Sequence, residues 1–318
     1  MSSPILLFLP LTAALLTLLP EQVNAAPDEL IPLQRLAASY GFPGATSSPN
    51  VITLQSQYRC LAFHTGSRRF VFNNRLFWLN GAVSKDGQNW CISRADAESI
   101  VAPLLQSRRA LKGQGCSLVV LDPGHGGSDP GTVSSRRIDE KRLVLDITKR
   151  VKRKLNASNV AVRMTRSRDT TLSLQDRPKR AARWGGDVFV SIHANSASST
   201  ACGIETFVMP AAGFPSTASS KPESRSYKGN KHDAVNTLLA GLVQHGALAH
   251  TGATDRGVKR ARFAVLRDAP CPAALVEVGF LSNQKEAAQL TTVAYRDAVA
   301  QGIAHGILTY LVKAEASQ

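Results

Sequence analysis

The 318-residue sequence lacks the features that mark several common classes of protein. Its five cysteines are scattered and none lies in a CxxC spacing, which excludes a small scaffold stapled by disulfides. Beyond the first twenty residues no apolar run is long enough to span a membrane, and no segment is repeated. What remains is a chain long enough to bury one large hydrophobic core and a smaller one.

The first residues read ILLFLPLTAALLTLLP and then EQVNAAP, an apolar run followed by small residues. This pattern predicts a signal peptide over residues 1–25, cleaved near Ala25 or Ala26, and export to the periplasm or cell envelope. No Lys or Arg precedes the run, so an uncleaved anchor is the alternative, although the run is short for a spanning helix.

Acidic residues are scarce as well, 23 against 38 Lys and Arg, for a net charge of +15. Removal of residues 1–25 takes away only Glu21 and leaves +16, and residues 136–183 alone hold 16 basic and 5 acidic residues. In an exported protein this basic block favours anionic envelope polymers or a membrane surface as partners. Nucleic acid is not expected, because the block has no interleaved aromatics and the signal removes the protein from it.

The N-terminal third indicates a short helix and linker over 26–50 and a small β-rich module over 51–108. Runs such as RCLAF, RRFVF and RLFWLN alternate with turn signals, and a helix is expected from Ser93 to Leu105. The module's aromatic residues form either its core or a binding surface. Cys60 and Cys91 are the plausible disulfide, and the basic stretch SRRALKGQGC reads as a linker.

The remainder, 117–314, alternates strand and helix patterns. The runs SLVVLD, VAVRMTR, DVFVSIH, GIETFVM, FAVLR and AALVEVG predict buried strands, and 287–312 predicts helix. Leu143, Ile147, Val151 and Leu155 recur every four residues, as on the buried side of a helix. The fold class is therefore α/β, with a mostly parallel twisted sheet flanked by helices.

Four ionisable residues are expected at one edge of this sheet. His125 follows SLVVLD in the turn DPGHGG, His193 ends DVFVSIH, and Glu277 lies at the end of AALVE. Glu140 begins the helix of Leu143, on its inward side, where a carboxylate needs a partner. Each residue alone has an ordinary structural explanation, but two imidazoles and a carboxylate with an open position are typical of catalytic zinc.

Six ordered motifs carry a resemblance over residues 117 to 312: VVLDPGHGGSDPG, the glutamate of DEKRLVLDI, RMTRSRDTTLSLQDRPKRA, DVFVSIHANS, DRGVKRARFAVLR and ALVEVGFLSN. The chain resembles the zinc-dependent N-acetylmuramoyl-L-alanine amidases, which cut the bond between muramic acid and the stem peptide of peptidoglycan. The resemblance implies that His125, Glu140 and His193 bind Zn²⁺ and that Glu277 is the catalytic acid/base. The chain departs from the common pattern at Trp184 and at RRID before Glu140, which bears on substrate shape.

Several points stay open at this stage. Arg256 could bind a stem-peptide carboxylate, orient Glu277 or form a structural ion pair. The alternatives to the amidase are a zinc peptidase that cuts within the stem peptide and a non-catalytic wall-binding protein. The short loop 215–228 argues against a plug helix and is expected to border the substrate groove, while the need for an activator protein is undetermined. The module faintly resembles copper amine oxidase N-terminal-like domains, and wall targeting is its expected role.

Overall fold

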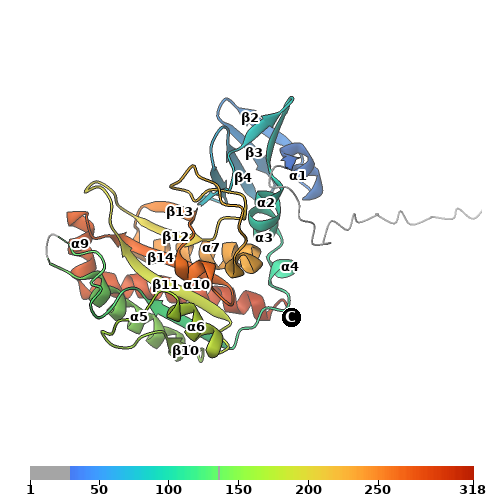
Figure 1. Cartoon of the computed structure of the whole chain (residues 1–318). Coiled ribbons are helices and arrows are strands. Elements are labelled where there is room, and N and C mark those ends of the chain that lie inside the picture. Colours follow the sequence, from blue (N-terminus) through green and yellow to red (C-terminus); the bar gives the residue numbers. More distant parts are fainter. Residues whose placement is uncertain (1–28, 135–136) are drawn as a thin grey trace, which may run out of the picture.

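The computed structural model describes residues 29–134 and 137–318, so the expected signal peptide lies outside the described residues. Figure 1 shows a large sheet flanked by helices, with the smaller N-terminal part beside it. The strands are β1 Leu30–Pro32, β2 Ala45–Ser48, β3 Val51–Gln55, β4 Cys60–His64, β5 Arg69–Phe72, β6 Arg75–Trp78, β7 Ser84–Asp86, β8 Asn89–Ser93, β9 Leu118–Pro123, β10 Ala161–Met164, β11 Val188–Asn195, β12 Ile204–Val208, β13 Asp255–Arg260 and β14 Ala273–Phe280. The helices are α1 Leu33–Ser39, α2 Arg94–Asp96, η1 Ala97–Val101, α3 Ala102–Leu105, α4 Ser107–Leu111, α5 Glu140–Ala157, α6 Asp176–Arg183, η2 Lys228–His232, α7 Asp233–Thr251, α8 Ala264–Arg267, α9 Gln284–Thr291 and α10 Val293–Glu315.

One sheet runs through both parts of the chain, in the order β10-β9-β11-β14-β12-β13-β6-β5-β4-β3-β2. From β10 to β13 neighbouring strands pair in parallel except at β14 and β12, which are antiparallel, so β12 and β13 both run opposite to β9, β10, β11 and β14. The prediction of a mostly parallel sheet flanked by helices is confirmed. Because of the reversal, the first residues of β12 and β13 lie at the same edge as the carboxyl ends of β9, β11 and β14.

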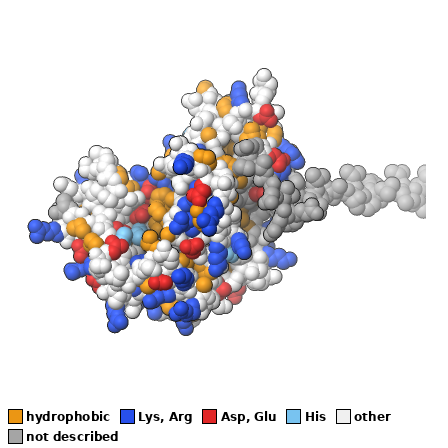
Figure 2. All heavy atoms as spheres, in the orientation of Figure 1, with side chains coloured by type: hydrophobic (Ala, Val, Ile, Leu, Met, Phe, Trp, Pro, Cys, Tyr) orange, Lys and Arg blue, Asp and Glu red, His pale blue; other side chains and the backbone are white. Residues whose placement is uncertain are grey.

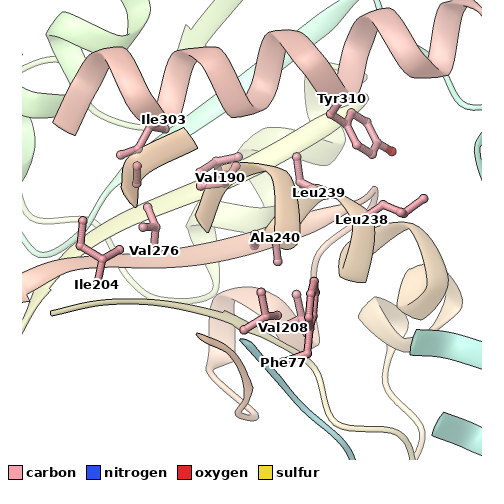
Figure 3. Close-up of a cluster of buried hydrophobic side chains, with 14 of the residues drawn as sticks. Phe77, Val190, Ile204, Val208, Leu238, Leu239, Ala240, Val276, Ile303 and Tyr310 are labelled. Atoms are coloured by element: carbon pink, nitrogen blue, oxygen red, sulfur yellow. The ribbon is translucent and has the colours of Figure 1, made fainter. Parts of the chain in front are cut away.

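The two faces of this sheet are covered unequally. Successive side chains of a strand point to opposite faces, and Figure 3 shows Val190, Ile204, Val208, Val276 and Phe77 on the face beneath α7 and α10. These residues belong to the main hydrophobic core, to which α5 also contributes. The opposite face packs a smaller core with α6 and α8, two short helices. These two helices cover only part of that face, and the candidate site described below lies beside them.

The predicted strand FAVLR is wrong. The structure places a single turn of helix, α8, at these residues, and the strand before it, β13, lies in DRGVKR instead. An apolar run this short does not distinguish strand from helix by periodicity. The predicted C-terminal helix is two helices, because Thr292 has extended backbone and caps α10 with its side chain.

Residues 29–50, the described part of the predicted short helix and linker, contain two strands in addition to the helix. The helix α1 was predicted, but β1 pairs with β8 and β2 pairs with β3, so both join the neighbouring sheets. The expected linker SRRALKGQGC also begins with a helical turn, α4. The module is joined to the larger part directly, since Phe77 of β6 pairs in register with Val258 of β13.

The expected disulfide between Cys60 and Cys91 is absent, and all five cysteines, which lie within the described residues, are free. Cys60 begins β4 of the large sheet, whereas Cys91 is buried on β8 of the three-stranded sheet β1-β8-β7. Proximity in sequence was a poor guide because the two strands belong to different sheets. Among the described residues, no helix has the length and apolar character that crossing a bilayer requires.

The close packing of α7 on α10 gives a first prediction. A Cβ atom added at Gly302 would lie 2.4 Å from the Gly246 carbonyl oxygen and 2.6 Å from the Ala247 Cα. Helix propensity alone would make Gly302→Ala stabilising by about 1 kcal/mol, but we expect a loss of about 2 kcal/mol because the helices must separate. Urea unfolding measures this, with exposed Gln301→Ala as control. A more stable Gly302→Ala protein would refute the packing.

Asp233, at the start of α7, gives a second prediction. Burial raises its pKa from 3.8 to about 7, against the opposing influence of Asn230, Arg260 and Arg262. The folded state therefore holds a proton that the unfolded state releases, and the free energy of unfolding should fall as pH rises from about 4 to 7, by about 3 kcal/mol. Asp233→Asn should lack this fall in the free energy of unfolding with pH, whereas exposed Asp86→Asn should keep it. The same pH dependence in all three proteins would contradict the raised pKa of Asp233.

Candidate active site

His125 lies on a tight turn immediately after β9. Its backbone has φ 56°, a left-handed conformation that costs a non-glycine residue energy. Its neighbour Gly124 is required for a different reason, because a Cβ there would come within 2.2 Å of the His193 ring. The glycine-rich turn therefore serves to bring the two histidines together, with ring centroids 4.9 Å apart.

Two buried arginines hold this turn in place. Arg177 donates to the carbonyl oxygens of Pro123 and His125, each at 2.8 Å, and pairs with buried Asp122 at 2.9 Å. Arg166 donates to Pro123 and Gly124 at 3.0 and 2.6 Å. Both arginines are 3% exposed. Both belong to the basic block of the sequence, and only their burial, which a charge count does not reveal, distinguishes them from its other members.

Glu140, the first residue of α5, lies between the two histidines. Its Oε1 atom is 3.1 Å from His125 Nε2 and 3.0 Å from His193 Nδ1, and it accepts from the backbone N–H of Ala194. Its Oε2 accepts from the N–H of Thr132. Burial alone would raise the pKa of Glu140, but the hydrogen bonds to the imidazoles hold it well below its usual range. The carboxylate is 3% exposed and charged.

The arrangement fits a metal ion. His125, Glu140 and His193 each offer a ligand atom, and these atoms lie within 4.8 Å of one another; among residues 29–134 and 137–318 no other such group of three is found. Asp129 approaches His125 Nδ1 at 2.8 Å, which leaves Nε2 toward Glu140 and orients the ring as a metal ligand requires. Two nitrogens and one oxygen suit zinc and leave a position for a substrate or water.

Glu277 lies beside this cluster on β14, in register with His193 of β11 and Glu205 of β12. It is 8% exposed, and its Oε2 atom has no hydrogen-bond partner. Burial raises the pKa of Glu277 well above its usual value, and the neighbouring Glu140 and Glu205 raise it further. Burying a carboxyl group without a hydrogen-bond partner costs free energy. The Glu277 carboxyl group points, as His193 does, to the face of the sheet that α7 and α10 do not cover.

Arg256 is part of an ion-pair cluster that the sequence analysis largely missed. Its Nε lies 2.6 Å from Glu205 Oε2, and Lys259 Nζ lies 2.6 Å from the same oxygen. Asn195 donates to the other oxygen of Glu205. The structural ion pair considered for Arg256 is present, with Glu205 as partner. Glu205 could have been suspected as a charged residue in the middle of the apolar run GIETFVM.

The structure thus brings the selected residues to one edge of the sheet, on the face away from α7 and α10. Figure 2 views the molecule from a side on which histidine side chains are visible beside acidic and hydrophobic ones. The loop 215–228 follows the end of β12 at the opposite edge of the sheet, and Arg68 and Arg262 donate to its carbonyl oxygens. Within residues 29–134 and 137–318, no hydrogen bond joins this loop to the histidine cluster. That it borders the substrate groove stays a prediction.

The cluster gives a prediction for metal binding. Wild-type protein should bind about one zinc ion per chain, and His193→Ala should lose it because two ligands hold zinc far more weakly than three. Asp129→Ala should bind about 10–100-fold more weakly, since it removes only the group that orients His125. Zinc content after dialysis measures both. His250→Ala, which changes an exposed histidine elsewhere, is the control; equal zinc in His193→Ala would exclude this site.

Residues 119–309 match the family described as N-acetylmuramoyl-L-alanine amidase. The chain is similar to amidase LytC of Bacillus subtilis, with 37% identity over 193 residues, which are 60% of this chain and 35% of that protein. It is also similar to amidase AmiA of Escherichia coli, with 31% identity over 227 residues, 64% of this chain and 78% of that one. The chain thus spans about a third of the length of the Bacillus relative.

Solved structures give the same result for the larger part of the chain. The catalytic domain of the amidase CwlV from Paenibacillus polymyxa is 38% identical and superposes with a TM-score of 0.53, over 62% of this chain and 98% of that one. Amidase AmiC2 of Nostoc punctiforme is 33% identical with a TM-score of 0.53, over 63% and 99%. The matched part comprises the histidine cluster and Glu277, and the N-terminal module lies outside the matched family region.

Proposed function

Because the chain belongs to the N-acetylmuramoyl-L-alanine amidase family, we propose that it is an exported zinc enzyme that cleaves peptidoglycan between muramic acid and the L-alanine of the stem peptide. The observation that supports this best is the His125–Glu140–His193 cluster beside a buried, unpartnered glutamate. Amide hydrolysis needs an electrophilic centre, which an ion held by the cluster would supply, and a group that moves a proton, which would be the buried glutamate.

His125, Glu140 and His193 would hold the zinc ion. When bound, the ion polarises the scissile carbonyl and makes a water molecule more acidic. The position of His125 is fixed by its neighbours: Arg166 and Arg177 hold the backbone of the turn after β9, and Asp129 orients the imidazole ring. The low pKa of Glu140 keeps the carboxylate charged as a ligand.

Glu277 would act as the acid/base. It accepts a proton from the attacking water and delivers it to the amine nitrogen of the leaving stem peptide, which departs poorly without one. The burial that raises its pKa suits this second step, because the carboxyl must hold a proton near neutral pH. Its position next to His193 in register keeps it within reach of the reacting group without making it a ligand.

Export and partners are part of the same proposal. The predicted signal peptide would carry the enzyme to the cell envelope, where peptidoglycan is. Exposed cations of the basic block, among them Lys149 and Arg153 on α5, would attract anionic envelope polymers or a membrane surface. Others are already paired, such as Arg150 with Asp146.

Digestion of purified sacculi tests the function. Wild-type enzyme should release stem peptides and leave peptide-free lactyl groups on the glycan, as read by mass spectrometry. Glu277→Gln should lower the rate by at least about 100-fold, since the proton transfer is lost, while its zinc content stays near one. Chelator should abolish the rate and zinc should restore it.

Two outcomes would contradict the proposal. Cleavage within the stem peptide, with L-alanine still joined to the lactyl group, would make the protein a zinc peptidase. Binding to sacculi with no released product from zinc-loaded wild type would make it a wall-binding protein. Gln301→Ala, on the exposed side of α10, serves as the control variant with full expected activity.

A further inference from the structure

The N-terminal module contributes a strand to the open face on which the site lies. In β6, Phe77 is buried on the face of α7, where it pairs with Val258 and contacts Gly241. Figure 3 shows its ring beside Val208 and Ala240. Because side chains alternate, the next residue, Trp78, points to the opposite face.

Glu205 and Glu277 point to this same face. Thr206, next to Glu205, donates its hydroxyl to Gln244 of α7, and Val276, next to Glu277, lies in the core beneath α7. Glu205 and Glu277 therefore face away from α7. The face of Trp78 is continuous with the face of Glu277 across four adjacent strands, β14, β12, β13 and β6.

Trp78 contacts Arg256 and Lys259, two cationic residues that lie near Glu277. Its indole N–H donates to the Arg256 carbonyl oxygen at 3.1 Å, and the Lys259 ammonium lies 6.0 Å from the ring centroid. Arg256 and Lys259 both pair with Glu205, which is the cross-strand partner of Glu277. A row of contacts thus leads from the reacting centre to the module.

Arg256 and Lys259 share the single carboxylate of Glu205 as ion-pair partner, and their side chains remain 31% and 15% exposed. The carboxylate of Glu286 also attracts Arg256 electrostatically, but its two oxygens accept from backbone N–H groups. Trp78 is half-buried, so part of the residue remains exposed to solvent. Two partly exposed cations that share one ion-pair partner beside a tryptophan suit a ligand that carries a carboxylate next to apolar groups.

Resting on the proposed function, we propose that Trp78, Lys259 and Arg256 form a subsite for the stem peptide. Trp78 packs against the apolar side of the peptide, and the two partly exposed cations receive a peptide carboxylate. The N-terminal module is then a part of the substrate-binding surface and not only a targeting unit. No covalent step is involved.

Matched tryptophan variants test this assignment. Trp90 lies in the same module with its own lysine, Lys85, 5.1 Å above the ring, but on the separate three-stranded sheet. On a soluble disaccharide-peptide, Trp78→Leu should raise KM about tenfold and leave kcat within about threefold, since binding energy is lost and the reacting groups are intact. Trp90→Leu should change neither. Unchanged KM in Trp78→Leu would overturn the subsite.

A binding measurement separates contact from a structural role. In a Glu277→Gln, Trp90→Phe, Trp184→Phe protein, Trp78 is the one tryptophan left. Its fluorescence should respond to a stem peptide and to a disaccharide-peptide, and not to peptide-free glycan. A C-terminally amidated peptide should bind about tenfold more weakly to this protein, and both peptides should bind equally when Lys259→Gln is added. A silent Trp78, or the same amide effect with Lys259→Gln, would overturn the proposal.

Failure of this subsite and failure of the proposed function give different results. If wild type cleaves sacculi at the lactyl amide but Trp78 neither affects KM nor responds to peptide, only the subsite is wrong. If Trp78 reports peptide binding but no lactyl amide is cleaved, only the amidase reaction is wrong.

Discussion

The Glu140 carboxylate between two imidazoles is the interaction on which the rest of the site depends. A charge that is 3% exposed must be compensated, and here the compensation comes from residues on α5, β11 and the turn after β9. The turn itself adopts a strained backbone, and the hydrogen bonds of Arg166 and Arg177 offset that cost. The placement of His125 is thus determined by two arginines that are themselves buried behind the turn.

Much of this could be predicted from the sequence because it depends on local patterns. Apolar runs ending in His193 or Glu277 indicate buried strands, and parallel strands bring their carboxyl ends to one edge. Glu140 was found from its place in a helical repeat. The larger fold and the position of the candidate site follow from these short patterns, whereas the roles of its residues came from the resemblance of the ordered motifs, with which family membership agrees.

Other features could not be predicted because they depend on pairing between distant segments. The sequence does not show that β12 reverses direction, so nothing linked Glu205 to Arg256 and Lys259. Four apolar residues at FAVLR fit a helical turn as well as a strand. The pairing of Phe77 with Val258 joins segments 181 positions apart, and no local signal announces such a contact.

Helices cover the two faces of the sheet unequally, so one face can carry the stabilising core while part of the other stays open to the candidate site. The face beneath α5, α7 and α10 carries the main core, and there β6 contributes Phe77 as β14 contributes Val276. The other face of the same strands is then free to present polar groups, because folding does not depend on burying them. Since alternation assigns each residue to one face or the other, a strand that contributes to the core must also present side chains to the opposite face. In β6 these two sets are Phe77 in the core and Trp78 on the face of Glu277, so the packing of the module and the substrate contact that we propose for it depend on the same strand.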